Sequence, residues 1–348
     1  MTWAGRRVLV TGHTGFKGAW LSWWLAREGA SVAGYALPPR ANAPSLFAAL
    51  RLDECVDSTL GDVRDPAALA ALVARFRPEA VFHLAAQALV RVSFLDPHET
   101  FETNVMGTVN LLEAVRASDS VRAVVVVTSD KCYAPPPAAG GYREDDPLGG
   151  DDPYSASKAA QEIVAASYRA SFFGGGPLLA TVRAGNVIGG GDWSPDRLIP
   201  DIIAALHAGV PVSLRRPEAV RPWQHVLEPL HAYRQVASRL LEGDAAVATC
   251  YNVGPGKSDQ RPVADVVDRM YRAWGREPAS RPEAEADLRE AGVLTLNTAK
   301  AARELGIVPR FGLEEACART AAWYRAWSQG AGGRALCDAD IDAFEAPR

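Results

Sequence analysis

The fold is decided by the stretch RVLVTGHTGFKG, Arg7–Gly18. Its first five residues form a largely apolar run of strand length, and a helical pattern begins at Gly15, directly after the turn. Gly12, Gly15 and Gly18 recur at every third position. Glycine lets a backbone turn tightly and approach a phosphate, and a helix N-terminus adds free N–H donors. The stretch therefore predicts the strand–turn–helix that opens a dinucleotide-binding domain.

Strand and helix candidates alternate along the first half of the chain. The run AVVVV, Ala123–Val127, is continuously apolar, which is typical of a parallel strand buried on both faces. This alternation predicts an α/β fold with a Rossmann-type, doubly wound parallel sheet. The strand candidates are Arg7–Thr11, Ser31–Ala36, Ala80–Ala85, Val121–Thr128 and Leu179–Ala184. The helix candidates are Gly15–Glu28, Pro66–Phe76, Glu102–Ala117 and Pro153–Phe172.

The second half of the chain has a looser pattern. Helices are predicted at Leu198–His207 and Leu313–Gln329, and the Gly-rich tail that follows is predicted to fray. We expect residues 1–185 to form the dinucleotide-binding domain. Residues 186–348 are expected to form mainly a smaller, mixed α/β lobe for the substrate, with some segments returning to the first domain and a cleft between the two.

Composition excludes several classes of protein. Of the 348 residues, 48% are hydrophobic and 22% are charged, which suits a folded chain and argues against wholesale disorder. The net charge of −4, without a long basic run, does not indicate a nucleic-acid-binding protein. No apolar run is long enough to cross a membrane, and the N-terminus leads directly into a strand, without a signal peptide. A soluble protein that is not exported is expected.

The cysteines point to a reducing compartment. They are odd in number, scattered, and never spaced CxxC, so neither a disulfide scaffold nor a metal site is expected. We expect reduced thiols in a cytoplasmic protein. The cysteines are Cys55, Cys132, Cys250, Cys317 and Cys337.

A second motif, DPYSASK, carries candidate acid–base chemistry. Asp152 and Pro153 are typical of a helix start, which places Tyr154 and Lys158 on one helix face at positions i and i+4. A phenol with a pKa of about 10 is a poor base, but a nearby cation lowers that pKa. Tyr154 is thus a candidate to accept a proton from a substrate hydroxyl. A bare YxxxK pattern also fits a solvated helix face.

The glycine spacing and the Tyr–Lys pair together resemble the extended short-chain dehydrogenases. HLAAQ, His83–Gln87, resembles the strand end that borders the nicotinamide in that family. TNVMGT, Thr103–Thr108, resembles its fifth-helix signature, and RAGNVIG, Arg183–Gly189, resembles the loop that receives a sugar diphosphate. The resemblance implies a nicotinamide cofactor and a nucleotide-sugar substrate.

The expected cofactor is NAD, with NADP left open. Asp62 resembles the family's adenine-contacting acid, although alone it also fits a turn or a helix cap. The end of the second strand, Gly34–Arg40, lacks the acid that often binds the ribose, and Arg40 would suit a ribose phosphate. The residues that the resemblance assigns to the cofactor are Gly12, Gly15, Phe16, Gly18, Asp62, Val63, Ala85, Tyr154 and Lys158.

The segment TSDKCY, Thr128–Tyr133, narrows the resemblance. Nucleotide-sugar 4,6-dehydratases of the thymidine type carry Thr-Asp-Glu where this chain has Ser129-Asp130-Lys131. The Asp-Lys version is similar to the dehydratases that act on CDP-glucose, as are GNVIGGGDW, Gly185–Trp193, and RPWQHVLEPL, Arg221–Leu230. The proline-rich loop Ala134–Pro137 departs from the family pattern.

This resemblance implies a lyase that converts CDP-D-glucose to CDP-4-keto-6-deoxy-D-glucose and water. Tyr154, assisted by Lys158 and by Ser129 at the strand end, would take the 4-hydroxyl proton while hydride leaves C4; Thr128 is the second choice for the hydroxyl. Water then leaves across C5 and C6, hydride returns to C6, and a proton returns to C5. Asp130 is implied as the acid for the leaving hydroxyl. Lys131 would be the C5 base or would stabilise the enolate.

Substrate binding is expected to depend on guanidinium groups, which suit a pyrophosphate. Arg216, next to Arg215, is a further candidate for binding the pyrophosphate. Trp193 would either line the nucleotide pocket or belong to the hydrophobic core. The residues predicted to bind substrate are Gln87, Asn186, Trp193, Arg197, Arg215 and Arg221.

Assembly and rival functions complete the expectations. The helices Glu102–Ala117 and Pro153–Phe172 correspond to those that pair between subunits in this family, so a homodimer is expected. Their apolar residues include Leu111, Leu112, Val115, Ile163, Val164 and Tyr168.

Three alternative functions remain for this sequence. They are a nucleotide-sugar 4-epimerase, a dehydratase for another nucleotide sugar, and a non-catalytic NADP-sensing regulator.

Overall fold

The fold is described from a computed structural model of the chain, for residues 2–135, 140–283 and 292–347. Pro136 and Pro137 of the proline-rich loop lie outside the described residues.

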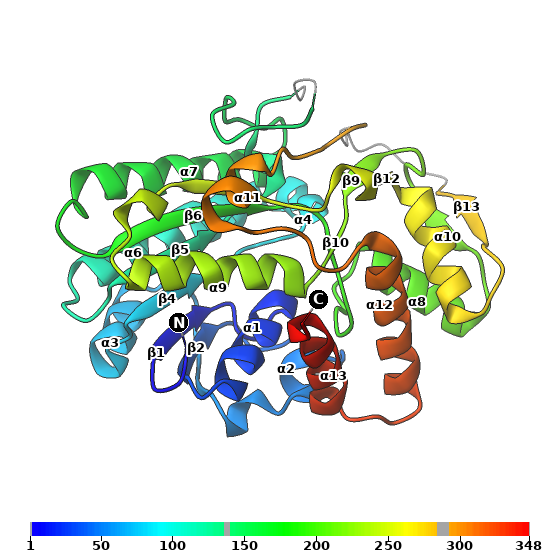
Figure 1. The fold of residues 1–348 in the computed structure, drawn as a ribbon, viewed down its shortest axis with the longest axis horizontal. Helices are drawn as coiled ribbons and strands as arrows, with labels where there is room; N and C mark the ends of the chain where they lie inside the picture. The colour runs from blue at the N-terminus through cyan, green and yellow to red at the C-terminus, as the bar shows by residue number, and fades with distance from the viewer. Residues whose placement is uncertain (1, 136–139, 284–291, 348) are drawn as a thin grey trace.

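A seven-stranded sheet forms the centre of the molecule (Figure 1). Its order is β11-β6-β5-β4-β1-β2-β3, and every neighbouring pair is parallel. This confirms the predicted doubly wound, Rossmann-type sheet. The strands are β1 (Arg7–Thr11), β2 (Ser31–Ala36), β3 (Asp57–Leu60), β4 (Ala80–His83), β5 (Ala123–Val127), β6 (Leu178–Ala184) and β11 (Cys250–Val253).

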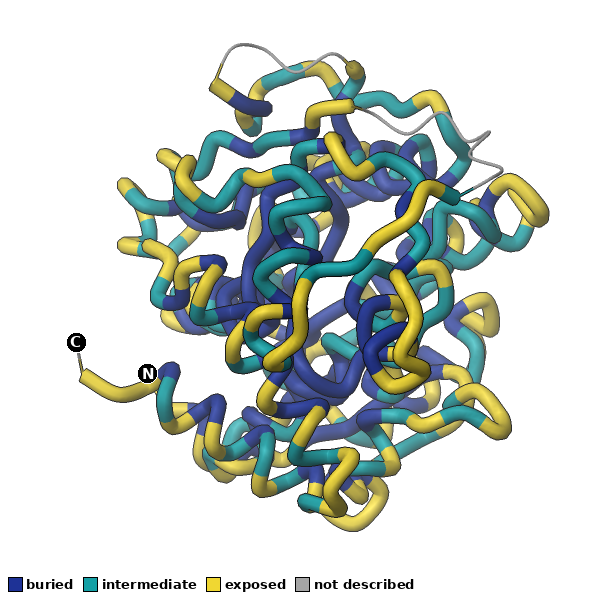
Figure 2. Tube along the Cα trace, turned by 90° about the vertical axis from the view of Figure 1, so that its right-hand side faces the viewer, coloured by how far each residue is buried: buried dark blue, intermediate teal, exposed yellow. Residues whose placement is uncertain are grey.

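Helices cover both faces of this sheet (Figure 1). One hydrophobic cluster lies between the sheet and α3, α6 and α7, and a larger one lies between the sheet and α1 and α9. Most residues of the sheet strands are buried, as the dark blue tube segments show (Figure 2), whereas the edge strand β3 (Asp57–Leu60) has none that is buried. These helices are α1 (Phe16–Arg27), α3 (Pro66–Phe76), α6 (Gly107–Arg116), α7 (Pro153–Ser171) and α9 (Leu227–Leu241).

The strand order reverses between β1 and β4, and this reversal positions the site. The chain runs from β1 outward to β2 and β3, then returns to β4 and continues the other way to β5 and β6. At such a reversal a crevice opens beyond the carboxyl ends of the strands, where α/β proteins bind ligands. The glycine turn follows β1, and Ser129 follows β5, so both lie at this edge.

A smaller lobe stands beside the sheet, on the right in Figure 1. Its elements come from the second half of the chain, but β11 and α9 from that half pack with the central sheet. The domain division at residue 185 stays a prediction. The lobe contains β7 (Val187–Ile188), α8 (Leu198–Ala208), β8 (Val212–Leu214), β9 (Val220–Pro222), β10 (Gln224–His225), β12 (Gln260–Pro262), α10 (Val263–Trp274), β13 (Ser280–Pro282) and α12 (Leu313–Ser328).

The remaining helices are short or peripheral. None of the helices among the described residues is long and apolar enough to cross a membrane. These helices are α2 (Leu46–Ala49), α4 (Val90–Leu95), α5 (Pro97–Phe101), α11 (Ala299–Leu305) and α13 (Gly333–Glu345).

The prediction of a fraying tail is wrong, because the tail forms helix α13. Cys337, Ile341 and Phe344 are spaced i, i+4 and i+7 and are all buried, so they form the apolar stripe of a docked helix. The helix starts against α2, where a Cβ on Gly333 would lie 2.6 Å from the Ala49 carbonyl oxygen. The glycines that suggested fraying therefore allow this close approach.

The single helix expected over Glu102–Ala117 is also divided. Glu102–Met106 forms a π-helical turn before α6 begins at Gly107. The buried Asn104 lies in this turn, and its side chain accepts a hydrogen bond from the Gln87 backbone N–H at 2.8 Å and donates one to Ser157 Oγ at 2.8 Å. A π-helical turn often marks a functional site in a helix. Here it contains Asn104, whose side chain makes the hydrogen bonds with Gln87 and Ser157.

Candidate active site

The glycine turn after β1 has the shape that a dinucleotide pyrophosphate requires. Gly12 has φ +79°, and a Cβ there would lie 2.8 Å from the backbone nitrogen of Ala85. A Cβ on Gly18 would lie 2.0 Å from the Gly12 carbonyl oxygen. Gly15 caps α1 without a side-chain hydrogen bond, and Phe16 begins the helix, whose first-turn N–H groups have no intrahelical acceptor. The turn thus fits a dinucleotide phosphate at a helix N-terminus.

Two of the residues predicted to bind the cofactor, Asp62 and Val63, follow β3. The carboxylate of Asp62 is paired with Arg64 at 2.6 Å, and this hydrogen bond holds the pKa of Asp62 below its ordinary value. Val63 is buried, and a Cβ on Gly107 of α6 would lie 2.7 Å from its Cγ2 atom. Ala85 lies beside the turn, with its N–H donated to Thr11 Oγ1 at 3.2 Å. The structure therefore brings these residues to one end of the sheet, with Asp62 already engaged by a neighbouring cation.

A short 3-10 turn, Asp130–Cys132, carries the predicted acid at the carboxyl end of β5. Ser129 caps this turn: its Oγ accepts the Lys131 N–H at 3.2 Å and donates to Asp130 Oδ1 at 3.0 Å. The second carboxyl oxygen of Asp130 is buried without a hydrogen-bond partner among the described residues. Burial raises the pKa of Asp130, and the charge of Lys131 opposes this rise. The turn therefore presents a buried carboxyl group whose pKa lies above its ordinary value.

The Tyr–Lys pair stands on the first two turns of α7. Asp152 caps the helix by accepting the Ser155 N–H at 2.9 Å, which confirms the predicted helix start. Tyr154 and Lys158 are both buried, and the Lys158 ammonium lies 5.9 Å from the Tyr154 ring centre. Lys158 Nζ donates to Gln161 Oε1 at 2.7 Å.

Burial controls the protonation of this pair. It raises the pKa of Tyr154 to about 12, against the lowering effect of a hydrogen bond with Ser129 and of the charge of Arg197. It also lowers the pKa of Lys158 to about 7, and the charge of Lys17 adds to this shift. Thr128, the second choice for the hydroxyl, also lines the cleft, but its hydroxyl donates to Glu162, whereas that of Ser129 donates to Asp130.

These groups meet in one cleft of about 780 Å³ between the sheet edge and the smaller lobe. All the predicted catalytic residues line it, together with most of the predicted substrate residues. Arg221 is buried, and its charge lowers the pKa of Asp130. The predicted residues that line the cleft are Ser129, Asp130, Lys131, Tyr154, Lys158, Asn186, Arg197, Arg215 and Arg221.

Two predicted substrate residues are not in the cleft lining. The Trp193 ring packs 5.8 Å from that of Trp323 and 5.6 Å from that of Trp327, in an aromatic cluster of the lobe. The side chain of Gln87 is engaged locally, since its amide donates to Thr100 Oγ1 at 2.9 Å and accepts the Leu89 N–H at 2.6 Å. Trp193 therefore packs with the core of the lobe and does not line the nucleotide pocket.

Lys17 is a cleft residue that the sequence did not assign. It stands in the first turn of α1, and its Nζ lies 3.4 Å from Tyr233 Oη. Burial lowers its pKa to about 8, with the charge of Arg197 acting in the same direction and that of Asp130 opposing it. The sequence could have indicated Lys17, because a charged residue stands there between two glycines of the turn, at the start of a mostly apolar helix.

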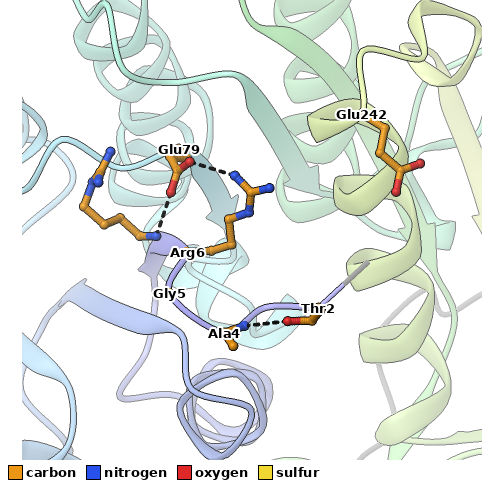
Figure 3. Close-up of a pocket in the computed structure, with 7 residues that line it drawn as sticks. Thr2, Ala4, Gly5, Arg6, Glu79 and Glu242 are labelled. Atoms are coloured by element: carbon orange, nitrogen blue, oxygen red, sulfur yellow. Dashed lines mark hydrogen bonds and ion pairs between the residues drawn. The ribbon is translucent and has the colours of Figure 1, made fainter.

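A second hollow lies at the opposite, amino-terminal edge of the sheet (Figure 3). There Arg6 pairs with Glu79 at 2.9 Å, and the Arg7 N–H also donates to Glu79, at 3.1 Å. None of the residues predicted for catalysis, the cofactor or the substrate lines this hollow.

The chain matches known nucleotide-sugar enzymes along nearly its whole length. The family model described as GDP-mannose 4,6 dehydratase matches residues 9–320. A CDP-glucose 4,6-dehydratase from Salmonella typhimurium is 49% identical over 334 residues, which is 94% of this chain and 93% of that protein.

Solved structures share the fold. A double mutant of dTDP-glucose 4,6-dehydratase from Streptomyces venezuelae, solved with NAD bound, has a TM-score of 0.78 and 28% identity, and the match covers 92% of this chain and 98% of that one. UDP-glucose 4-epimerase from Thermus thermophilus, in complex with NAD, has a TM-score of 0.77 and 29% identity, over 92% of this chain and 99% of that one. These matches show that the chain belongs to the nucleotide-sugar 4,6-dehydratase family of extended short-chain dehydrogenases.

Proposed function

We propose that this protein is a lyase that converts CDP-D-glucose to CDP-4-keto-6-deoxy-D-glucose and water, with NAD as its resident cofactor. The observation that carries the proposal is the Asp130 carboxyl at the end of β5. It is buried, one of its oxygens has no hydrogen-bond partner in the described part of the chain, and it lies in the same cleft as Tyr154 and Lys158. An epimerase has no leaving hydroxyl and needs no such acid. The 49% identity to a CDP-glucose 4,6-dehydratase supports the choice of nucleotide.

Oxidation at C4 uses the residues of α7. The glycine turn would hold NAD, and the nicotinamide would supply a hydride acceptor for C4 and a hydride donor for C6, where hydride addition is completed by a proton at C5. Tyr154 accepts the proton of the 4-hydroxyl, for which it must first be a phenolate. Burial alone opposes this state, and the hydrogen bond with Ser129 and the charge of Arg197 favour it. The 4-keto group that results makes the C5 proton acidic.

Elimination uses the turn at the end of β5. The C5 proton leaves as a base removes it, and the C6 hydroxyl leaves as water after receiving the proton of Asp130. Burial raises the pKa of Asp130, which acts in favour of the protonated acid, and the carboxyl oxygen without a hydrogen-bond partner among the described residues can donate the proton. Two roles stay open for Lys131, which lines the cleft: removal of the C5 proton, or stabilisation of the enolate charge.

Arginines hold the diphosphate in this proposal. Arg197 and Arg221 line the cleft nearest to the acid and the phenol, since their charges act on Asp130 and Tyr154. Arg215 and Arg216 lie further along the cleft wall, at the end of β8. A planar guanidinium binds phosphate oxygens in pairs, so these four cations can hold the nucleotide end while the sugar faces Tyr154.

Incubation of the purified protein with individual nucleotide sugars tests this function. CDP-glucose with NAD should give a 4-keto-6-deoxy sugar, detected by mass as loss of water, while UDP-, dTDP- and GDP-sugars should react far more slowly. Parallel reactions with NADP check the cofactor. Inversion at C4 without loss of water would show an epimerase, preferred turnover of another nucleotide would show a different dehydratase, and no turnover would favour a regulator.

We further infer a cytoplasmic location. All five cysteines lie in the described part of the chain and none forms a disulfide, which suits a reducing compartment.

We also infer a homodimer that uses the face made by α4, α5 and α7. This face exposes large apolar side chains that a monomer would leave in water. Leu111, Leu112 and Val115 do not contribute, because they are fully buried against the sheet. The exposed apolar residues on this face, with the adjoining π turn and the end of α7, are Phe94, Leu95, Phe101, Met106, Ile163 and Phe172.

A charge on this face should break the dimer. Ile163→Glu places a carboxylate on a side chain that is 60% exposed in the single chain, so it should cost little in folding and much in association. Light scattering should give twice the chain mass of 37.2 kDa for the parent and the chain mass for the variant. Val308→Glu, at an equally exposed position away from this face, is the control. A parent that scatters as a monomer at micromolar concentration contradicts the inference.

A further inference from the structure

A buried ion pair lies directly behind the turn that carries Asp130. Glu162 of α7 and Arg183 of β6 approach to 2.8 Å, and their side chains are only 3% and 4% exposed. Removing two charges from water is costly, and such a pair persists only where further hydrogen bonds complete its geometry. Here those further bonds run to both flanks of the turn.

The carboxylate holds the residue before the turn. Glu162 accepts a hydrogen bond from the hydroxyl of Thr128, which ends the strand that leads to Ser129, and a second from Thr181 Oγ1 at 2.6 Å. Thr128 and Thr181 lie on neighbouring chain segments at the β5 and β6 side of the sheet. One carboxylate therefore joins α7 to the strand end from which the turn begins.

The guanidinium holds the residue after the turn. Arg183 donates to the hydroxyl of Tyr133 at 2.7 Å and to the Glu144 carbonyl at 3.1 Å. The Tyr133 hydroxyl in turn donates to Asn252 Oδ1 at 2.6 Å, and its ring stacks on Tyr142 with ring centres 4.6 Å apart. The turn Asp130–Cys132 is thus fixed at both ends by the two members of one ion pair.

We propose that the Glu162–Arg183 pair, acting through Thr128 and Tyr133, positions the Asp130 carboxyl for the elimination of water. This inference rests on the proposed dehydratase function. Glu162, Arg183 and Tyr133 are positioning residues, because none of them lines the cleft.

The effect should fall on one step of the reaction. Tyr154 and Lys158 belong to a regular helix that Asp152 caps, so their places depend little on Tyr133. Asp130 stands on a three-residue turn between the two clamped flanks. A displacement of about 1 Å can cost about a hundred-fold in rate when a group must meet a reacting atom. Removing a contact of Glu162 with Thr128, or of Arg183 with Tyr133, should therefore slow elimination more than C4 oxidation.

Tyr133→Phe is the primary test, because it deletes only the hydroxyl and keeps the ring that stacks on Tyr142. In a single turnover with CDP-glucose, reduced nicotinamide should form at close to the parent rate, while its disappearance and product formation slow by roughly tenfold or more. Tyr251→Phe is the matched control: this buried tyrosine of β11 donates to Glu304 at 3.2 Å and does not touch the turn. It should leave both steps unchanged.

Glu162→Gln should also slow the elimination of water. Because the Glu162 charge also raises the pKa of Lys158, this variant should slow C4 oxidation as well, and thermal unfolding is recorded because Arg183 is left buried without its counter-charge. Equal slowing of both steps in Tyr133→Phe, or a lower Tm with an unchanged ratio of the two rates, would show a purely structural role and overturn the proposal. If the parent itself forms no 4-keto-6-deoxy product from CDP-glucose, the proposed function fails instead, and the parent reaction alone reveals this.

Discussion

Tyr154→Phe is expected to lower the rate of C4 oxidation by about a hundred-fold or more, the usual loss when a general base is removed. The variant keeps the aromatic ring in its buried site and removes only the group that accepts the 4-hydroxyl proton. Sugar and cofactor should still bind. Single-turnover formation of reduced nicotinamide after mixing with CDP-glucose measures this step directly.

The pH dependence gives a second readout of the same residue. Tyr154 acts only after losing its proton, and burial raises its pKa to about 12 in the free chain. Below that pKa the phenolate fraction grows as pH rises, so parent oxidation should accelerate with pH, and Tyr154→Phe should lose this dependence.

Tyr168→Phe serves as the control for Tyr154→Phe. It lies on the same helix, and its hydroxyl binds Glu113 at 2.7 Å, away from the cleft. Near-normal oxidation in Tyr154→Phe would remove this residue from the mechanism.

Asp130→Asn should separate elimination from oxidation. The amide keeps the size of the side chain but cannot supply a carboxylic proton, and hydroxide leaves poorly without an acid. Oxidation depends on Tyr154, Lys158 and Ser129, which remain. Reduced nicotinamide should therefore accumulate and persist in the variant, whereas in the parent it should be small or transient.

The protonation of Asp130 sets the direction of the pH effect on this step. Burial raises its pKa, and the acid is useful only while protonated. Parent elimination should then fall as pH rises through that raised pKa, and the residual elimination of Asp130→Asn should not follow this fall. Stopped-flow absorbance of reduced nicotinamide across a pH series measures both.

Asp201→Asn is the matched control for the acid. Asp201 also lines the cleft, on α8, and burial raises its pKa as well, but it lies in the smaller lobe rather than at the end of β5. It should turn over without a stalled reduced cofactor. Normal turnover of Asp130→Asn, with no reduced cofactor accumulating, would assign the acid to another residue.

Much of the fold could be predicted from the sequence because its signals are local. The bounds predicted for β1, β2 and α3 agree with the structure, since apolar runs, the glycine spacing and the cap of Asp65 act within a few residues. The positions of Tyr154 and Lys158 followed in the same way from helical periodicity and the Asp152 cap. The motifs also indicated which strand ends would meet at one edge of a parallel sheet.

Other elements depended on contacts between distant parts of the chain. β3 is a half-exposed, partly polar edge strand, and β11 joins the sheet from the second half, so neither carried a clear local pattern. Helix α13 forms because its apolar stripe docks on distant segments, a gain that outweighs the glycines at its start. Trp193 joined the lobe's aromatic cluster for the same reason.

The sequence by itself determined the fold class, the glycine turn, and the chemical groups available after β1, after β5 and at the start of α7. Only the tertiary structure decided which of those groups share the cleft, that Lys17 lies among them, and that Glu162 and Arg183 clamp the turn of Asp130. The physical reason is distance along the chain. Residue type and spacing fix local geometry, whereas burial, pKa and pairing depend on neighbours that are brought together only when the sheet and the lobe pack.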